Sequence, residues 1–373
     1  MSTLPPINKP LSERPELSFT LPSEYYLSPE VYEYEKENIF YKTWQYIAHE
    51  VMLPDPGDYL TLSICGQNVF VIRSSDGELR SFYNVCRHRA HELLSGAGNV
   101  RKLIVCPYHA WSYNNSGCLK SARMSDNRPG FDKTEFGLRE IRLELFCGCI
   151  FVNLDDTAES LQSIAGDLEV DIRNRLPYLD KLKLAGTDLL GETKMSAGWK
   201  VVVDNFVECY HCRPAHRDFA SLIDMDAYQV DIFDYWSRQT GPKIRYDNSA
   251  YAVDPEVGMQ QSVFWYLWPN TTFNVLPGSD ELTVFSIRPI DITTSSFGGQ
   301  SFNVDGKVYQ PRADYASEIL APEDISLCES VQRGLASKSY EQGAFIVDPD
   351  NPGESEYALH HFHRLVQQAL SGV

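Results

Sequence analysis

The first half of the chain alternates short apolar segments with turns, and this pattern predicts strands. Between Tyr59 and Ile72 apolar residues recur in a run rich in β-branched side chains around a Gly-Gln-Asn turn, so we expect a hairpin there. Further short apolar segments, separated by Gly, Asn and Ser, follow at 82–85, 103–106, 110–113 and 148–154. Residues 45–157 are therefore predicted to form a small all-β domain.

Helical spacing of apolar residues is found on both sides of this β-rich stretch. Residues 1–20 are Pro-rich and polar, which predicts an extended arm, and residues 28–41 begin with Ser-Pro-Glu, a helix-start signal. Apolar residues about 3.6 positions apart predict more helices at 161–179, 199–212, 315–340 and 354–371. Strands are predicted at 264–268 and 282–290. The second half should therefore be α+β, with helices packed against an antiparallel sheet.

The length of 373 residues suits one large or two medium domains. The pattern divides the chain into an arm and helix at 1–44, the all-β domain at 45–157 and the α+β domain at 158–373, with the domain boundary near 155–160. We find no internal repeat and no low-complexity segment.

Charge and hydropathy exclude several classes of function. The chain has 33 basic and 51 acidic residues and a formal net charge of −18, which opposes binding to nucleic acid or to an anionic membrane surface. No apolar run reaches the roughly 18–20 residues that span a bilayer. The N-terminus lacks the basic region and apolar core of a signal peptide. We therefore expect a cytoplasmic protein without a nucleic-acid or membrane partner.

The nine cysteines do not suggest a disulfide framework. An odd number in a chain without a secretory signal indicates a reducing compartment, where cysteines are buried, catalytic or metal-bound. Cys209 and Cys212 form a C-x2-C pair without a partner pair nearby, so we expect neither a zinc site nor a redox role for them. His360, His361 and His363 are expected on the surface of the last helix.

Cys86-Arg-His88 and, seventeen residues later, Cys106-Pro-Tyr-His109 supply two thiolates and two imidazoles. Each segment supplies one Cys and one His, whereas zinc fingers pair Cys with Cys and His with His. Two thiolates on one iron and two imidazoles on the other are the ligands of a Rieske [2Fe–2S] cluster, whose potential is raised by the neutral imidazoles. The pattern predicts such a cluster, with His91 outside the ligand set.

A second metal motif lies between Asp204 and His216. Glu208 is three residues before His211, so the two side chains can share one helical face. Pro214 disfavours regular helix and lets the chain bring His216 back towards His211. Two histidines and one carboxylate form the facial triad of non-haem Fe(II) oxygenases. The acidic residues in the segment APEDISLCESVQRGL, Glu323 and Asp324, are the candidates for the third ligand.

With these motifs the chain resembles, over nearly its whole length, the oxygenase (alpha) component of Rieske non-haem iron oxygenases. It is most similar to the carnitine monooxygenase and glycine-betaine demethylase branch, in the segments FYNVCRHRAHELLSG, VCPYHAW, WKVVVDNFVECYHCRPAH and PEDISLCESVQRGL. Three positions depart from the commoner family pattern: Arg87 replaces Pro, Ala90 replaces Gly, and Glu208 stands where most aromatic-ring oxygenases have Asp.

The resemblance implies an N-terminal Rieske β-domain and a C-terminal helix-grip catalytic domain, assembled as a head-to-tail homotrimer. It implies that Glu208 bridges the two metal centres. The other implied site residues are the cluster ligands Cys86, His88, Cys106 and His109 and the mononuclear iron ligands His211, His216 and Asp324.

The implied function is O2 activation at Fe(II) with electrons from NADH. The chain has neither a dinucleotide-binding fingerprint nor a plant-type ferredoxin Cys cluster, so a separate flavin/iron–sulfur reductase should supply the electrons one at a time. The substrate would be hydroxylated at a C–H bond; where that carbon is bonded to nitrogen, the C–N bond then breaks. The alternatives are an aromatic-ring hydroxylase or O-demethylase and, outside the enzymes, a Rieske electron carrier.

An aromatic run provides the argument for a quaternary-ammonium substrate. Strand alternation places Phe264, Tyr266 and Trp268 on one face of the sheet, and Phe206 lies within the second metal motif. Aromatic rings attract a quaternary ammonium by about 0.5–2 kcal/mol each. The same rings could instead fill the core of the catalytic domain, and the sequence leaves both interpretations open.

Overall fold

The β-rich pattern of the first half folds into antiparallel sheets, as the sequence predicts. In the computed structural model, which describes residues 4–186 and 192–371, residues 41–162 form one of two units. Its main sheet has the strand order β1-β10-β9-β4-β3-β2-β5, and a second sheet has the order β6-β7-β8. The strands are β1 (Gln45–His49), β2 (Asp58–Ile64), β3 (Gln67–Arg73), β4 (Leu79–Tyr83), β5 (Ala97–Asn99), β6 (Ile104–Val105), β7 (Ser112–Tyr113), β8 (Leu119–Ser121), β9 (Glu140–Phe146) and β10 (Cys149–Asn153).

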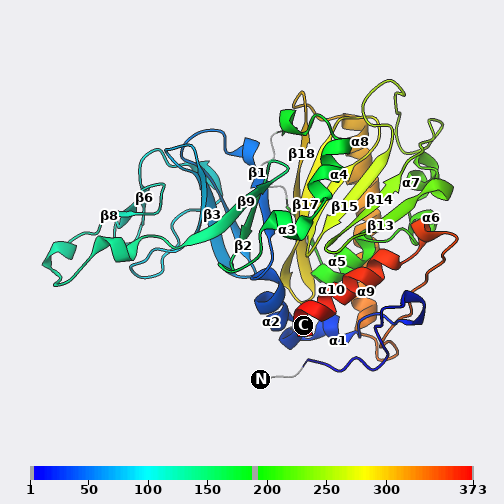
Figure 1. Cartoon of the computed structure of the whole chain (residues 1–373), viewed down its shortest axis with the longest axis horizontal. Coiled ribbons are helices and arrows are strands. Elements are labelled where there is room, and N and C mark those ends of the chain that lie inside the picture. Colours follow the sequence, from blue (N-terminus) through cyan, green and yellow to red (C-terminus); the bar gives the residue numbers. More distant parts are fainter. Residues whose placement is uncertain (1–3, 187–191, 372–373) are drawn as a thin grey trace. The chain divides into compact units, whose positions relative to one another are not determined.

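Residues 4–40 and 163–371 form the other unit, built on an eight-stranded antiparallel sheet (Figure 1). The strand order is β11-β18-β17-β16-β15-β14-β13, and β12 also pairs with β18. The strands are β11 (Lys183–Leu184), β12 (Glu192–Met195), β13 (Gln229–Ile232), β14 (Trp236–Gly241), β15 (Ser262–Leu267), β16 (Thr271–Val275), β17 (Leu282–Asp291) and β18 (Thr294–Asn303). Together with its helices this sheet confirms the α+β class.

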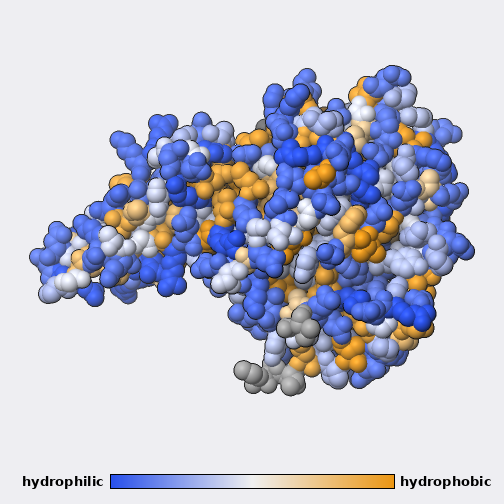
Figure 2. All heavy atoms as spheres, in the orientation of Figure 1, coloured by the Kyte–Doolittle hydropathy of each residue, from blue (hydrophilic) through white to orange (hydrophobic). Residues whose placement is uncertain are grey.

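The helices are α1 (Glu24–Leu27), α2 (Pro29–Glu35), α3 (Leu161–Ala165), α4 (Leu168–Arg175), α5 (Trp199–Phe206), α6 (Cys212–Ala215), α7 (Arg217–Leu222), α8 (Gln310–Tyr315), α9 (Ala321–Leu335) and α10 (Tyr357–Ser371). They cover both faces of the sheet: on β15, the Trp265 indole donates to Asp171 of α4, whereas the next ring, Tyr266, packs against Phe362 of α10. None of the helices in the described ranges is long and apolar enough to cross a membrane, and hydrophilic residues dominate the face in Figure 2.

Four predicted helices are interrupted. The helix predicted at 28–41 changes after Glu35, the end of α2, into a π-helical segment, Lys36–Phe40. The helix predicted at 161–179 is divided into α3 and α4 at Gly166, which has a φ of +55° that an L-residue rarely adopts. The helix predicted at 199–212 ends at Phe206, and a turn follows. A π-helical segment, Ala316–Leu320, joins α8 to α9. Such segments are frequent at functional sites, and this one directly precedes α9, the helix that carries the predicted ligand Asp324.

The predicted N-terminal arm is a fixed part of the second unit; its first three residues lie outside the described ranges. Phe19 forms an isolated antiparallel bridge with Ala344. Glu35 of α2 forms a buried ion pair with Lys200 of α5 and accepts a hydrogen bond from the Trp199 indole at 2.8 Å. The helix that leads into the second metal motif is therefore held by residues from the start of the chain.

Candidate metal centres

The two loops predicted to bind the cluster have the same backbone shape. In each, the residue four positions after the cysteine donates its N–H to the cysteine carbonyl, Ala90 to Cys86 at 3.1 Å and Ala110 to Cys106 at 3.0 Å. Both alanines have positive φ, +54° and +58°. Glycine adopts this left-handed conformation most easily, which agrees with the glycine that the resemblance leads us to expect at position 90. Ala90 adopts this conformation although its Cβ makes a positive φ less favourable than it is for glycine.

The loops bring the four predicted cluster ligands together. Cys86 and Cys106 are buried, and the His88 and His109 rings lie with their centroids 4.8 Å apart. Among the described residues, Nδ1 of His109 is buried without a hydrogen-bond partner. A buried ring nitrogen without a partner costs free energy unless something binds it. The donor set therefore fits a [2Fe–2S] cluster with two cysteines and two histidines.

A tyrosine supports the first of these loops. Tyr113 of β7 is fully buried, and its hydroxyl lies 3.3 Å from Sγ of Cys86 and accepts the N–H of Arg87 at 3.0 Å. Burial raises the pKa of Cys86, while the hydrogen bond with Tyr113 lowers it. Hydrogen bonds to ligand sulfurs are one of the means by which a protein sets the potential of an iron–sulfur cluster.

The second metal motif lies where α5 ends and the chain turns. Glu208 organises the turn: its Oε2 accepts the N–H of Tyr210 and, at 3.2 Å, that of His211. The short helix α6 follows, and His216, between α6 and α7, has the non-helical angles φ −111° and ψ 70°. His216 faces His211, with ring centroids 5.0 Å apart, as expected, but the break lies at His216 itself, because Pro214 is part of helix α6.

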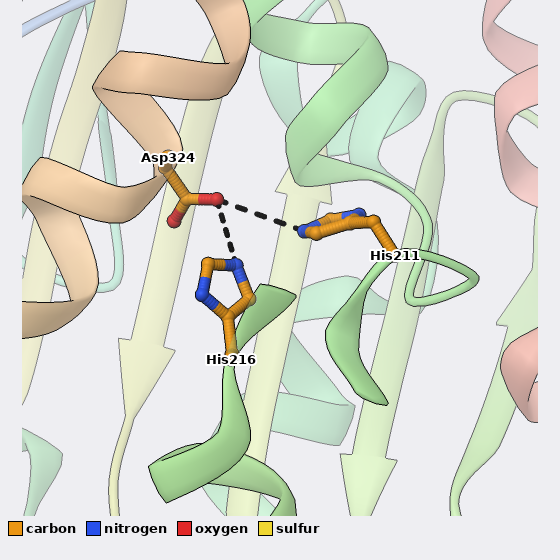
Figure 3. A group of neighbouring side chains, drawn as sticks. All are labelled: His211, His216 and Asp324. Carbon is orange, nitrogen blue, oxygen red and sulfur yellow. Dashed lines mark hydrogen bonds and ion pairs between the residues drawn. The ribbon is translucent and has the colours of Figure 1, made fainter. Parts of the chain in front are cut away.

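Helix α9 completes the group from more than a hundred residues away. Oδ1 of Asp324 lies 2.9 Å from Nε2 of His216 and 3.6 Å from Nε2 of His211, and Figure 3 shows the three side chains pointing toward one another. One ligand atom from each residue lies within 4.8 Å of the others. Ligands bound to one ion at about 2.1 Å lie roughly 3 Å apart when adjacent, so the group fits a single metal ion.

Nδ1 of each imidazole, the nitrogen that does not face Asp324, contacts a glutamate carboxylate. Nδ1 of His211 lies 2.5 Å from Oε1 of Glu208, and Nδ1 of His216 lies 2.7 Å from Oε2 of Glu323. Burial lowers the pKa of His211, but the hydrogen bonds with Asp324 and Glu208 outweigh burial and raise it to about 10. Burial raises the pKa of Asp324, but its hydrogen bonds with both histidines outweigh burial and lower the pKa to about 2.

The aromatic residues predicted to contact substrate separate into two groups. Tyr266 and Trp268 are buried, and both pack against Phe362 of α10, which favours the core interpretation for these two. Phe264, on the same face of β15, packs 6.0 Å from Phe219 of α7, the helix that follows His216. Phe206, at the end of α5, packs 5.8 Å from Phe285 of β17.

Two features differ from the sequence analysis. Cys209 and Cys212 form a disulfide that spans the turn carrying His211. The prediction of surface positions was wrong for His360 and His363, which are 5% and 0% exposed. The main chain of Leu21 donates to Nδ1 of His363 at 3.0 Å, which makes burial of this polar ring affordable.

His363 also belongs to a buried network that the sequence analysis missed. Its Nε2 lies 3.0 Å from Oδ1 of Asp204 on α5, and Tyr26 of α1 donates to Oδ2 of Asp204 at 2.7 Å. The partners come from three distant segments of the chain. No sequence pattern connects them, apart from the presence of an acidic residue on the apolar helix α5.

A cluster site with two cysteines and two histidines and a two-histidine, one-carboxylate site in one α+β chain define the class of two-centre iron oxygenases. The family models agree: residues 43–133 match the Rieske [2Fe–2S] domain, and residues 191–372 match the ring hydroxylating alpha subunit (catalytic domain). The chain is 36% identical to the carnitine monooxygenase oxygenase subunit of Acinetobacter pittii over 99% of both chains. It is 28% identical to spinach choline monooxygenase, over 95% of this chain and 79% of that one.

The fold is also similar to that of a solved Rieske monooxygenase structure. The crystal structure of the quaternary ammonium Rieske monooxygenase CntA with L-carnitine is 36% identical, with a TM-score of 0.86 over 95% of this chain and 97% of that chain. The chain belongs to the Rieske oxygenase alpha subunits, in the family of the carnitine monooxygenase oxygenase subunits. Its cofactors are accordingly a Rieske cluster and a mononuclear iron, and it works with a reductase partner.

Proposed function

We propose that this chain is the oxygenase subunit of a monooxygenase that hydroxylates a small quaternary-ammonium compound, such as carnitine or a betaine. The observation that carries the proposal is the convergence of His211, His216 and Asp324 on one point. The full-length similarity to carnitine and choline monooxygenases supports the substrate class.

In this proposal Cys86, His88, Cys106 and His109 hold the cluster, and His211, His216 and Asp324 hold the iron. When bound, the cluster supplies single electrons and the iron(II) activates O2 beside the substrate. The three side chains would hold the ion and leave coordination positions open for O2 and substrate. Glu208 and Glu323 accept the Nδ1 protons, so each histidine would bind the metal through Nε2.

The overall reaction consumes one O2, two electrons and two protons, and yields one hydroxyl group on the substrate and one water. On a carbon bonded to nitrogen, the product is a carbinolamine, which collapses into an amine and a carbonyl compound. The reaction would therefore break a C–N bond or remove an N-methyl group. Phe206 and Phe264 remain our candidates for substrate contacts, because Phe206 ends helix α5 just before Glu208 and Phe264 packs against Phe219, three residues after His216.

Electron transfer requires a second copy of the chain in this proposal. We place Glu208 between the two centres, with His109 of a neighbouring subunit as its second partner in a head-to-tail homotrimer. The electrons come from NADH through a flavin/iron–sulfur reductase. We also assign the protein to the cytoplasm, because seven of its nine cysteines are free thiols and two of these, Cys86 and Cys106, must be reduced to bind the proposed cluster.

Iron analysis tests this assignment of two centres against a simple electron carrier. The reconstituted protein should contain three irons per chain, two in the cluster and one in the mononuclear site. The Asp324→Ala variant should contain two irons and keep the visible absorption of the cluster. A wild-type protein with only two irons would contradict the proposal, and so would an Asp324→Ala variant that keeps all three.

A further inference from the structure

Both ring nitrogens of His216 contact carboxylates of two consecutive residues of α9. Its Nδ1 lies 2.7 Å from Oε2 of Glu323, and its Nε2 lies 2.9 Å from Oδ1 of Asp324. The imidazole is almost completely buried, with 3% of the side chain exposed, so these two carboxylates largely determine its orientation. One turn of α9 thus supplies both the proposed iron ligand, Asp324, and the Glu323 carboxylate at the opposite ring nitrogen of His216.

The chemistry of imidazole gives Glu323 a specific task. A histidine binds a metal in its neutral form, with one ring nitrogen protonated and the other offering a lone pair. An ionised carboxylate can only accept hydrogen bonds, so Glu323 selects the tautomer of His216 with the proton on Nδ1. That tautomer has its lone pair on Nε2, the nitrogen that faces Asp324.

We propose that Glu323 is a positioning residue that fixes the tautomer and orientation of His216 and thereby sets the affinity of the mononuclear site for iron(II). The inference rests on the proposed function, in which His216 and Asp324 bind iron. It gives two neighbouring carboxylates different roles: Asp324 is the ligand, and Glu323 acts through His216.

A purely structural role for Glu323 is the competing explanation, and the structure argues against it. An acidic residue in the first turn of a helix usually stabilises the free N–H groups there. However, α9 continues from the π-helical segment Ala316–Leu320, and the residue before it, Leu320, is itself helical (φ −63°, ψ −52°). Among the ion pairs of the described residues, Glu323 pairs with His216 and with no Lys or Arg.

The contact between Glu208 and His211 can be compared with the contact between Glu323 and His216. Glu208 makes the same contact with Nδ1 of His211, at 2.5 Å, but it lies on the turn that carries this histidine and also accepts main-chain N–H groups there. Glu323 comes from a different element and, in the described structure, hydrogen-bonds only with His216. Substitution of Glu323 therefore tests the imidazole contact without disturbing a turn.

The test is the iron(II) dissociation constant of the mononuclear site, measured by chelator competition on full-length protein with the cluster intact. Carboxylates that orient metal-bound histidines typically contribute about 10–100-fold to metal affinity. We expect Glu323→Gln to bind iron(II) at least tenfold more weakly, with wild-type cluster absorption and thermal unfolding. The matched control is Glu329→Gln on the same helix, because Glu329 accepts the N–H of Ser196 at 3.0 Å and contacts neither histidine.

Wild-type iron(II) affinity in Glu323→Gln would overturn the inference, and so would an equal loss of affinity in Glu329→Gln. If Glu323→Gln does not fold, Glu323→Asp decides instead, since it keeps the charge and withdraws the carboxylate by about 1.5 Å. Weaker iron(II) binding by a normally folded Glu323→Asp supports the inference, and wild-type binding overturns it. Failure of the proposed function is distinguishable, because the wild-type protein itself would then lack the third iron.

Discussion

Glu208 is the residue whose substitution should affect activity most without removing a metal ligand. Its carboxylate accepts three hydrogen bonds: from Nδ1 of His211 at 2.5 Å, from the N–H of His211 at 3.2 Å and from the N–H of Tyr210. The amide of Glu208→Gln has a single acceptor oxygen, and its NH2 group would face a donor. At least one charge-assisted hydrogen bond must therefore be lost.

The size of the effect follows from these contacts. A hydrogen bond to a charged group contributes about 1.5–3 kcal/mol, and about 1.4 kcal/mol corresponds to a factor of ten. If this free energy is lost from the electron route, turnover should fall by roughly 10- to 150-fold. At saturating iron(II) the variant should keep both metal centres and bind substrate normally. Glu208→Asp should also be slower, because it shortens the reach of the carboxylate.

Stopped-flow measurement of cluster reoxidation by O2, with substrate bound, is the direct assay. The control is Glu354→Gln, because Glu354 pairs with Arg213 in the same region, at 2.8 Å, without touching either imidazole. We expect slow reoxidation in Glu208→Gln and a wild-type rate in Glu354→Gln. A wild-type rate in Glu208→Gln would refute the bridging role.

Three further predictions concern the surroundings of the iron site. Tyr26→Phe removes the hydrogen bond to the Asp204 carboxylate and should lower the free energy of unfolding by about 1.5–3 kcal/mol; an unchanged denaturation midpoint, followed by tryptophan fluorescence, would contradict this. Lys200→Met leaves Glu35 without its buried partner and should cost about 3–5 kcal/mol, much of which the double variant with Glu35→Gln should restore; equal destabilisation of both variants would contradict the ion-pair argument. Because the raised pKa of His211, about 10, keeps it protonated in the metal-free protein, iron(II) must displace a proton, and its affinity should rise about tenfold per pH unit from pH 7 to 9; pH-independent affinity by chelator competition would exclude this coupling.

The metal sites could be predicted from sequence to the extent that their ligands are local. Each cluster loop carries its own Cys and His, and His211 and His216 belong to one segment, so short spacing patterns were sufficient to identify them. The choice between Glu323 and Asp324 was different, because the residue pattern left both open and only the family resemblance selected Asp324. The two are adjacent in sequence and more than a hundred residues from the histidines, and only their positions in space show that Asp324 faces Nε2 while Glu323 faces Nδ1.

Long-range polar contacts were the part that sequence reasoning could not reach. His363 was expected on the surface, because hydropathy assigns polar side chains to water. It is buried because Asp204, Tyr26 and the main chain of Leu21 satisfy its ring nitrogens. Periodicity also predicted helix α5 too long. The helix ends at Phe206, because the Glu208 carboxylate accepts main-chain N–H groups and stabilises a non-helical turn, which a hydrophobic pattern does not show.

Product analysis across a panel of substrates tests the central claim most directly. The full-length protein, reconstituted with iron and supplied with NADH and a flavin/iron–sulfur reductase, would be incubated with carnitine, γ-butyrobetaine, glycine betaine, choline and naphthalene. Oxygen uptake, trimethylamine and formaldehyde would be measured together. We predict substrate-dependent oxygen uptake with stoichiometric trimethylamine or formaldehyde from at least one quaternary-ammonium compound, and none of either product in the Asp324→Ala variant. Hydroxylation of naphthalene with no reaction of any quaternary-ammonium compound would contradict the account.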